Sequence, residues 1–486
     1  MRKRFEQQLH IGQYPISEIK INPKSGNALV QLVAALKKLY CTEEYSERIF
    51  SVLECFLEGK DKNNGRPGMD LWTIFVLAQV RLCLNCSYDM LHHQANNDYL
   101  LRCFLGVERL GFDRIEFEYQ QIYDNVSRLN DQMLKELNDI IVEFGQKEIF
   151  KKKNTALHLK TDSFVVESNV HFPTDYNLLW DCLRKSLDIV KYFTKHHKVE
   201  GWRKYFDWFY RLKRLMRSLG RASSGGGKNK EKRQQEAAQS YLSVSLLLLE
   251  KIKKSKLEFP VNNEKDLISM YFLEEFMALA YKHIDLIERR ILKGEKIPHE
   301  EKIFSIFETY TEWITKGKLR PNVELGKRVA ITTDQYNLIV DYQIMEHEED
   351  RDIVIAIADR LLPKYSIYSW SFDKGFWSSL NRDLLRLVIP NVVMPKIGKL
   401  TKEDKELETS RLFKKLKNKH SAIESNINEL EHRGLDRCPD RGYFHFKSYV
   451  ALAVCAYNLK KIGKQILANQ RNELDSQQKV LHKKAA

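Results

Sequence analysis

A strand-like segment in the first half of the chain reads LHLKTDSFVV and covers residues 157–166. Apolar and polar side chains alternate along it, and β-branched and aromatic residues close it, which predicts a β-strand. The preceding residues show helical spacing instead, with apolar side chains at Ile49, Val52 and Leu53. The character of the chain therefore changes near Lys151, where we expect a sheet domain to begin.

Further strand-like segments follow only after a long stretch with helical spacing. Two of them, residues 328–333 and 338–345, flank the turn-forming sequence Asp334-Gln335-Tyr336-Asn337 and predict a hairpin. The remaining order is predicted to be helix 351–362, strand 367–372, helix 378–388, strand 391–395 and helix 415–467. The predicted fold class is therefore α/β, with a sheet domain interrupted by a helical insertion and preceded by an all-helical domain.

The predicted domain organisation has four parts. Residues 1–150 form the N-terminal helical domain, and residues 151–172 together with 326–468 form the discontinuous sheet domain. Residues 173–325 form the helical insertion. Its residues 221–234, rich in Ser, Gly and Lys, are predicted to be a flexible basic loop. The Gln- and Lys-rich tail, residues 469–486, is predicted to be loose.

Breaks and caps predict the N-terminal helical domain in more detail. The sequence Gly65-Arg66-Pro67-Gly68 interrupts the chain ahead of an apolar helix at residues 71–84. Ser87 is predicted to be the N-cap of the next helix, because its hydroxyl group is able to accept a hydrogen bond from the first turn. One further amphipathic helix is expected over residues 116–144.

The chain is strongly basic, with 80 Lys and Arg residues against 65 Asp and Glu residues and a formal net charge of +15. Such a charge attracts polyanions, because binding releases the counterions held by phosphate groups. Together with an aromatic fraction of 11%, the charge favours a nucleic-acid-binding protein over a basic protein without such a partner.

The sequence predicts no membrane partner. The longest apolar run, residues 241–249, is about half the length that a bilayer requires, and residues 1–8 lack the apolar stretch of a secretory signal. Eight cysteines are scattered over the chain, as expected for reduced thiols in a cytoplasm. Cys83 and Cys86 form a C-x-x-C pair within helical sequence, which we interpret as core residues, with a metal or redox site as the alternative.

Three acidic residues stand where a sheet domain is able to bring them together. Asp162 lies in the first strand, Asp373 ends a later strand and Glu424 lies on a late helix. Acidic side chains at strand ends converge with one from a neighbouring helix in open α/β sheets. Three such carboxylates repel one another unless a cation neutralises them, and oxygen ligands select Mg²⁺ or Mn²⁺. Taken singly, each acid has an alternative reading as a surface charge or a turn former.

Four segments carry a more specific pattern. They are Gly65-Arg66-Pro67 with residues 101–106; residues 159–163 with 167–175; Asp373-Lys374-Gly375-Phe376 with Asn381-Arg382; and Glu424 followed by Arg433-Gly434-Leu435-Asp436-Arg437, Arg441-Gly442 and Asn458-Leu459. In these segments, which cover about half of the chain, it resembles the DDE transposases of bacterial insertion sequences, a branch of the ribonuclease-H-like superfamily.

The resemblance implies a fold, an activity and a set of site residues. The sheet would be mixed and ribonuclease-H-like, and Asp162, Asp373 and Glu424 would be the catalytic ligands of two Mg²⁺ ions, with Mn²⁺ as a substitute. The protein would bind the terminal inverted repeats of its insertion sequence, hydrolyse phosphodiester bonds there and join the 3′-hydroxyl ends to target DNA. Its partners would be double-stranded DNA and, on that DNA, a second copy of the chain, in the bacterial cytoplasm at the nucleoid.

Two alternatives to a transposase remain open. One is a DNA-binding relic or repressor whose catalytic site has decayed, although all three acids are present. The other is a metal-dependent nuclease that cuts DNA without strand transfer.

Residues 198–217 interleave aromatic and basic side chains. Aromatic rings stack on unpaired bases while Arg and Lys bind phosphate groups, so this stretch is a candidate DNA-binding surface. An amphipathic helix with buried rings and solvated cations is the alternative. The candidate DNA-binding residues are Arg203, Lys204, Arg211, Lys213 and Arg214, with Arg437 and Arg441 from the last segment of the resemblance.

Other acids near the predicted site have more ordinary interpretations. Asp334 lies at the hairpin turn, where Asp is favoured for backbone reasons. The acidic run Glu348-Glu349-Asp350 precedes a predicted helix and suits its positive end. Glu167 and Asp175 follow the first strand and are candidates for groups that support the site.

Overall fold

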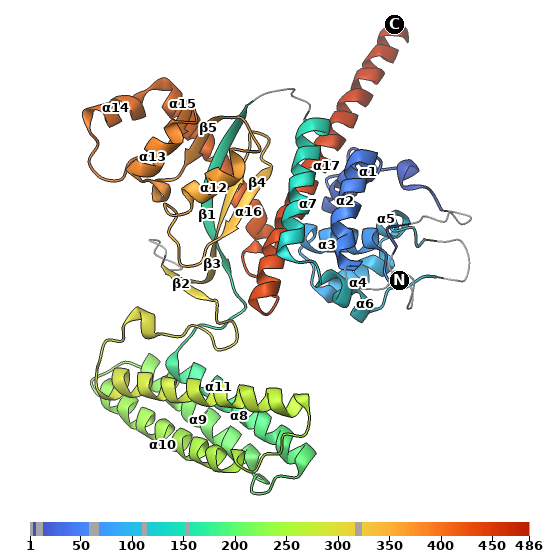
Figure 1. Ribbon diagram of the computed structural model, residues 1–486. Helices are drawn as coiled ribbons and strands as arrows, with labels where there is room; N and C mark the ends of the chain where they lie inside the picture. Colours follow the sequence, from blue (N-terminus) through green and yellow to red (C-terminus); the bar gives the residue numbers. More distant parts are fainter. Residues whose placement is uncertain are drawn as a thin grey trace. The chain divides into compact units, whose positions relative to one another are not determined.

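The computed structural model describes residues 3–5, 13–57, 68–108, 114–150, 156–315 and 323–485, and side chains up to residue 478. The chain divides into two compact units, one formed by Met1–Asn169 with Ile314–Ala486 and the other by Val170–Trp313 (Figure 1). The break predicted at Gly65-Arg66-Pro67 lies outside the described residues.

The N-terminal part of the first unit is helical. Its α-helices are α1 (Ala28–Tyr40), α2 (Glu43–Leu53), α3 (Leu71–Cys83), α4 (Tyr88–Asn97), α5 (Tyr99–Phe104), α6 (Tyr119–Val126) and α7 (Asp131–Phe144). The predicted N-cap at Ser87 is confirmed, because its Oγ accepts a hydrogen bond of 3.1 Å from the Met90 N–H group. The single helix predicted over residues 116–144 is wrong: Asn130 caps α7 through the Met133 N–H group at 2.8 Å, which separates α7 from α6.

A long C-terminal helix, α17 (Tyr443–Ala485), packs against α1, α3 and α7 (Figure 1). The tail from Asn469, predicted to be loose, instead continues this helix, because its Gln, Glu, Leu and Lys residues are good helix formers. No single helix among the described residues is long and apolar enough to cross a bilayer; α3 and α4 meet that test only as a pair bent by 118°.

The sheet has six strands, β1 (Leu157–Glu167), β2 (Glu312–Thr315), β3 (Val323–Thr333), β4 (Ile339–Ile344), β5 (Ile367–Phe372) and β6 (Asn391–Val393). Its order is β2-β3-β1-β5-β6, and β4 also pairs with β3. β1 is antiparallel to β3 and parallel to β5, and β5 is parallel to β6. The molecule is therefore mixed α/β, with a helical N-terminal region and an open sheet of parallel and antiparallel strands.

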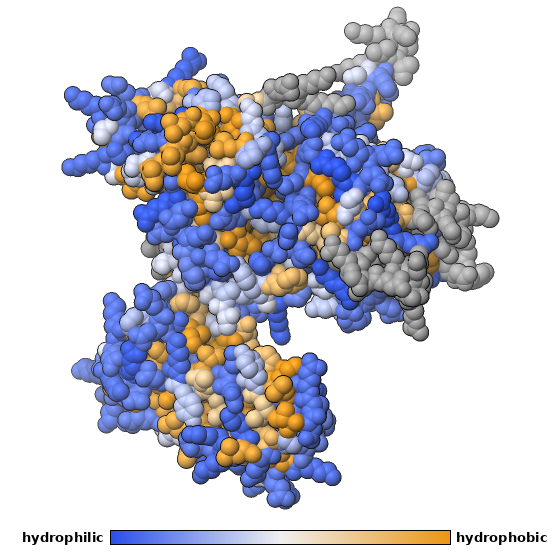
Figure 2. Space-filling model, in the orientation of Figure 1, coloured by the Kyte–Doolittle hydropathy of each residue, from blue (hydrophilic) through white to orange (hydrophobic). Residues whose placement is uncertain are grey.

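Helices from the C-terminal half flank this sheet. They are α12 (Val354–Leu361), α13 (Ser379–Arg386), α14 (Lys402–Thr409), α15 (Arg411–His420) and α16 (Ala422–Leu430). Leu159, Trp370 and Phe372 share one apolar core with Val354 and Ile357 of α12. α15 contacts β5 and β6, and α16 contacts β1. Figure 2 shows apolar surface where Figure 1 places α13 and α15.

The second unit is a helical bundle, coloured green to yellow in Figure 1. Its long helices are α8 (Asp175–His197), α9 (Tyr205–Ser224), α10 (Lys230–Lys256) and α11 (Glu264–Ile287). They enclose a core that includes Phe193, Trp202 and Tyr241. The loop predicted at residues 221–234 is wrong in extent, because α9 and α10 leave only residues 225–229 between them. The flanking Arg, Lys, Glu and Gln residues favour helix more strongly than the Gly run opposes it.

Within the first unit, a buried amide joins the N-terminal helices to the sheet. Asn458 of α17 accepts a hydrogen bond from the Ile339 N–H group at 2.8 Å and donates to the Ile339 carbonyl at 2.9 Å. The same amide nitrogen donates to Asn138 Oδ1 of α7 at 2.8 Å. Both backbone groups at the start of β4 are thereby paired, and two helices are fixed against the strand.

Replacement of Asn458 by Ala is predicted to destabilise the protein. The change leaves the Ile339 N–H group and Asn138 Oδ1 buried without these partners, and each such group costs about 1–3 kcal/mol. We expect a lower midpoint in scanning calorimetry. Asn472→Ala, on the exposed part of α17, is the control. Equal midpoints for the two variants would show that the buried amide contributes nothing to stability.

Candidate active site

The register of β1 against β5 places two of the predicted acids side by side. The two strands are parallel, and the last residues in register are Thr161 and Phe372. Asp162 and Asp373 are the next residue on each strand, and Asp373 keeps an extended backbone. Neighbouring strands lie about 4.8 Å apart, and residues in register point to the same face of a sheet. The two carboxylates therefore belong to one face, at the point where β5 ends.

Alternation along the strands identifies that face. Trp370 and Phe372 belong to the core shared with α12, so Ser371 and Asp373 face the other way. Ser371 Oγ lies 3.0 Å from Nδ1 of His420, the last residue of α15, which confirms the assignment. α16 follows α15 and contacts β1, and Glu424 lies in its first turn. The third predicted acid thus comes from a helix that packs on the face of Asp162 and Asp373.

The pKa of the Asp162 carboxyl group also reflects the nearby acids. Burial raises the pKa of Asp162 to about 7, against a hydrogen bond from the Ser163 N–H group to Oδ1 at 2.8 Å, which lowers it. The negative charges of Asp373, Asp350 and Glu424 raise this pKa further. Asp162 is half-buried, whereas Asp373 and Glu424 are exposed. The structure therefore brings Asp373 and Glu424 within electrostatic reach of Asp162.

A fourth carboxylate, Asp350, acts on Asp162 through its negative charge, and the sequence analysis did not identify it. Its Oδ1 accepts a hydrogen bond of 2.7 Å from Ser163 Oγ, on the residue after Asp162. The expectation that Glu348-Glu349-Asp350 lies at the positive end of a helix is wrong, because α12 begins at Val354 without an acid in its first turn. Five acids lie between residues 346 and 352, and no local pattern distinguishes the one that turns toward β1.

The donor set suits a hard divalent cation. Among the described residues, no group of three or more His, Cys, Asp or Glu side chains lies close enough together to hold a metal ion as it stands. Carboxylate oxygens are nevertheless the ligands that Mg²⁺ and Mn²⁺ prefer. Burial and, to a smaller extent, the neighbouring negative charges raise the pKa of Asp162, and a bound cation would relieve the repulsion among these charges. By its chemistry, the site fits such an ion.

Polar contacts hold α16 in place on this face. Lys160 Nζ and Asn426 Nδ2 both donate to Asn337 Oδ1, at 3.1 Å and 3.3 Å, which ties β1 and α16 to the β3–β4 turn. Lys460 Nζ lies 2.5 Å and Lys461 Nζ 2.8 Å from the Glu429 carboxylate.

Three ionisable groups in these contacts have altered pKa values, and burial lowers that of Lys460. Burial lowers the pKa of Lys160. Burial raises the pKa of Glu429, but hydrogen bonds from Lys460 and Lys461 outweigh it and bring the value down to about 2. The helix that carries Glu424 is thus held at Asn426, in its middle, and at Glu429, near its C-terminal end.

The other predicted acids have structural contacts. Asp334 is fully buried and accepts hydrogen bonds from the Tyr336 and Leu338 N–H groups at 2.8 Å and 2.9 Å, as the turn interpretation predicted. Burial raises its pKa to about 6. Asp175 lies in the first turn of α8, in the second unit, and forms an ion pair of 3.0 Å with Arg290. Glu167 ends β1, where its backbone pairs with residues 436–438.

The candidate DNA-binding residues lie in both units. Lys213 is half-buried on α9. The other candidates in the second unit lie on α9 or just before it and are exposed; they are Arg203, Lys204, Arg211 and Arg214. On the same stretch Trp202 is buried, whereas Phe206 and Tyr210 are 52% and 64% exposed. The stretch therefore has the buried aromatic side that the amphipathic-helix interpretation predicts, and its exposed rings and cations leave the DNA-binding interpretation a prediction. In the first unit, Arg437 and Arg441 are exposed, and Arg437 donates to Asn169 at 3.1 Å.

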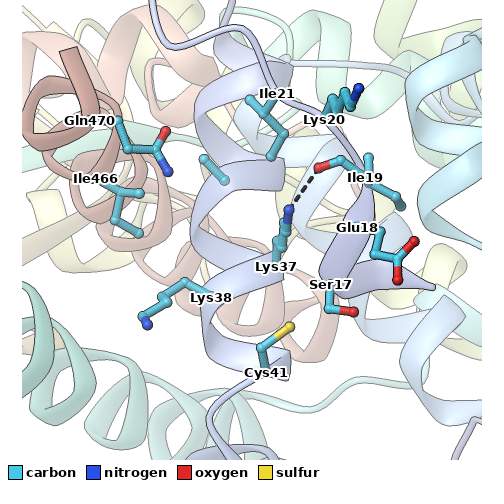
Figure 3. Close-up of a pocket in the computed structure, with 11 residues that line it drawn as sticks. Ser17, Glu18, Ile19, Lys20, Ile21, Lys37, Lys38, Cys41, Ile466 and Gln470 are labelled. Carbon is cyan, nitrogen blue, oxygen red and sulfur yellow. Dashed lines mark hydrogen bonds between the residues drawn. The ribbon is translucent and has the colours of Figure 1, made fainter. Parts of the chain in front are cut away.

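Two other features do not resemble a catalytic site. Cys83 is buried at the end of α3 and Cys86 is half-buried, which fits the core interpretation of the C-x-x-C pair. Figure 3 shows a pocket of about 590 Å³ between α1, the segment before it and α17. There the Lys37 amine donates to the Ile19 carbonyl at 2.7 Å, and Glu18 is the one carboxylate among the described lining residues.

Comparison with known proteins adds no relative. No protein-family model, no curated protein and no solved structure matches the chain.

The raised pKa of Asp162 predicts how metal-free stability depends on pH. Because its folded pKa of about 7 lies above the unfolded value of 3.8, stabilisation is fully present below about pH 4 and is lost as the pH rises through about 7. Asp162→Asn removes the ionisable group, so the variant does not lose this stability as the pH rises. At pH 8 in a chelator, we expect the melting temperature of the variant to exceed that of the wild type by at least about 2 °C.

The comparison of the two proteins across pH 4 to 8 is the measurement. Asp334, whose pKa is also raised, titrates in both proteins and cancels in the difference. Melting curves that stay parallel over the whole range would contradict the prediction.

Proposed function

We propose that the protein is a DNA transposase of the DDE type. It binds the terminal inverted repeats of its insertion sequence, hydrolyses phosphodiester bonds there and joins the freed 3′-hydroxyl ends to target DNA. The observation that carries the proposal is the grouping of Asp162 with Asp373 and Glu424, whose charges both act on the Asp162 carboxyl. A ribonuclease-H-like sheet is expected to place these strands side by side and parallel, and the pairing of β1 with β5 supports that fold.

Asp162, Asp373 and Glu424 would hold two Mg²⁺ ions, or Mn²⁺ ions as substitutes. When bound, such a pair of ions activates a water or a 3′-hydroxyl group and stabilises the leaving oxygen. The protein's own part is to hold the three carboxylates on one face of the sheet, with Asp162 steadied by the Ser163 N–H group. Asp162 must be ionised to act as a ligand, so its pKa of about 7 makes ion binding compete with protonation near neutral pH.

The reaction needs no covalent bond between protein and DNA, because water and the DNA hydroxyl group are the nucleophiles. Two element ends must be joined to one target, so the active form on DNA would contain two copies of the chain. The net charge of +15 favours association with such a polyanion.

Removal of one carboxylate is predicted to abolish the chemistry and leave DNA binding intact. Asp162→Asn, Asp373→Asn and Glu424→Gln should each lower the rate of end cleavage by more than about 100-fold. The substitutions remove ligand charge without changing side-chain shape. Glu406→Gln, at an exposed position on α14, is the control. The assay uses labelled DNA carrying the inverted repeats that flank the gene, with Mg²⁺ or Mn²⁺.

The products of that assay separate the proposal from its rivals. Joined DNA products support a transposase, cleavage without joining indicates a nuclease, and end binding without cleavage indicates a decayed enzyme. Full activity of all three variants, or of the wild type in a chelator, would refute the assigned site.

The exposed cations on and before α9 are predicted to bind phosphate groups. Reversal of charge at Arg203, Lys204, Arg211 and Arg214 should weaken DNA binding at least about 10-fold at low salt. It should also flatten the dependence of log K on log[salt] by about 1 or more, since each lost phosphate contact removes about 0.9 from the slope. The measurement is a titration of labelled DNA at several salt concentrations.

The matched control reverses four exposed lysines elsewhere in the second unit. They are Lys253, Lys254, Lys265 and Lys282. If both sets weaken binding equally, only the net charge matters, and α9 is not a specific contact surface.

A further inference from the structure

We propose that one face of α9, in the second unit, binds unpaired nucleotides of DNA. Phe206 and Tyr210 stack on the bases, and three arginines contact the phosphate groups; they are Arg214, Arg217 and Arg221. The inference rests on the proposed function for its ligand, because cleavage at an element end leaves a strand terminus at which base pairs open. It goes beyond that function, whose partner is double-stranded DNA, by assigning a separate site to the unpaired state.

The five side chains form one stripe along α9, which we call the α9 stripe. Its successive members are four, four, three and four residues apart, the spacing of neighbours on one helix face. From Phe206 to Arg221 the helix rises roughly 22 Å. Phe206 and Tyr210 are 52% and 64% exposed, and the three arginines are exposed as well. Leu212 and Leu219, on the opposite side of the helix, are buried in the core of the bundle.

The two rings of the α9 stripe present nearly parallel faces. Their centroids lie 6.4 Å apart, and their planes are inclined by 24°. Lys191 Nζ of α8 lies 5.5 Å from the centroid of the Phe206 ring and helps to fix it. Exposed rings of this kind stack on bases of any sequence. A paired base hides both of its faces within the duplex, so the ligand of such rings is an unpaired base.

The arginines of the α9 stripe indicate a polyanion. α9 carries five Lys and Arg residues, and its one acid, Asp207, lies in the first turn. Among the residues that the structure describes, no carboxylate forms an ion pair with Arg214, Arg217 or Arg221. Guanidinium groups that are not neutralised by the protein bind phosphate groups strongly. Aromatic rings at one end of a basic stripe are the combination that binds single strands.

A second exposed pair of rings in the same unit has a different charge environment. Tyr271 and Phe272 of α11 are 59% and 44% exposed, and the exposed acids Glu274 and Glu275 follow them. Tyr271 also donates a hydrogen bond of 2.8 Å to Glu275. Carboxylates repel a phosphate backbone, so exposure of rings alone does not select this ligand. The α11 pair is therefore a matched control for the α9 stripe.

Binding of two labelled probes to the full-length protein tests the proposal. They are an oligothymidine of about 20 nucleotides and a blunt duplex of the same length, and the measurement is fluorescence anisotropy. We expect Phe206→Ala and Tyr210→Ala each to weaken oligothymidine binding at least about 5-fold and to change duplex binding less than about twofold. Tyr271→Ala and Phe272→Ala should leave the affinity for both probes within about twofold of the wild type.

Two further sets of variants separate stacking from packing and charge. Phe206→Trp and Tyr210→Phe keep a ring and should bind oligothymidine as the wild type does. Combined replacement of Arg214, Arg217 and Arg221 by Gln should flatten the dependence of log K on log[salt] for oligothymidine. Each lost phosphate contact removes about 0.7 from that slope for a single strand.

A cross-link tests the same contact in the unsubstituted protein, so the test does not depend on the folding of a variant. An oligothymidine carrying 5-iodouracil is irradiated, which joins the base to an aromatic ring stacked on it, and the linked peptide is identified by mass spectrometry. We expect the link at Phe206 or Tyr210. Links confined to other aromatic residues would overturn the inference.

The outcomes distinguish this inference from the proposed function. Unchanged oligothymidine binding by both Ala variants, or equal losses for the two probes, overturns the site for unpaired bases; cleavage and joining of element ends by the wild type would then leave the transposase standing. Ring-dependent binding of oligothymidine by a protein that does not cleave element ends would support the α9 stripe and overturn the proposed function.

Discussion

The register of the sheet depends on the hydroxyl group of Thr161. This group is fully buried, shares a hydrogen bond of 2.7 Å with Thr332 Oγ of β3 and accepts another of 2.7 Å from Trp370 Nε1 of β5. One atom thus locks the central strand to both neighbours. A slip of one residue would turn every side chain of β1 to the other face. Asp162 would then lie in the apolar core against α12, and it would no longer share a face with Asp373.

With this register, the two faces of β1 make different contacts. Leu159 belongs to the core with α12, while Lys160 reaches the β3–β4 turn, to which α16 is tied through Asn426. Asp162 continues the polar face. The same contacts that bury the strand therefore position the helix that carries Glu424. These contacts also keep Asp162 close to other carboxylates whose negative charges repel it. Such repulsion is common at functional sites.

Much of the sheet could be predicted from the sequence, because alternation and turn chemistry are local signals. The strand 367–372 has the bounds that were expected, and the turn at Asp334 forms as predicted. The errors lie where local signals compete. Asn130 caps a helix inside a continuous amphipathic pattern. The Gly run near residue 225 interrupts the helices over fewer residues than the predicted loop, because the residues on both sides of it are helical. Asp350 could not be predicted, because Ser163 and Gly375 hold it across long sequence separations.

The helical unit is accommodated by the antiparallel pairing of β1 with β3. Glu167, the last residue of β1, is in register with Gly326 of β3, so the chain leaves and re-enters the sheet at the same end. A Cβ atom at Gly326 would lie 2.0 Å from the Val166 carbonyl oxygen, so the close approach of the strands there requires glycine. At about 3.3 Å per residue, this end of β1 lies roughly 16 Å along the strand from Asp162. The insertion, residues 170–313, is therefore topologically an enlarged hairpin connection. Substitution of Lys and Arg residues in the insertion therefore leaves unchanged the strand register that positions the carboxylates.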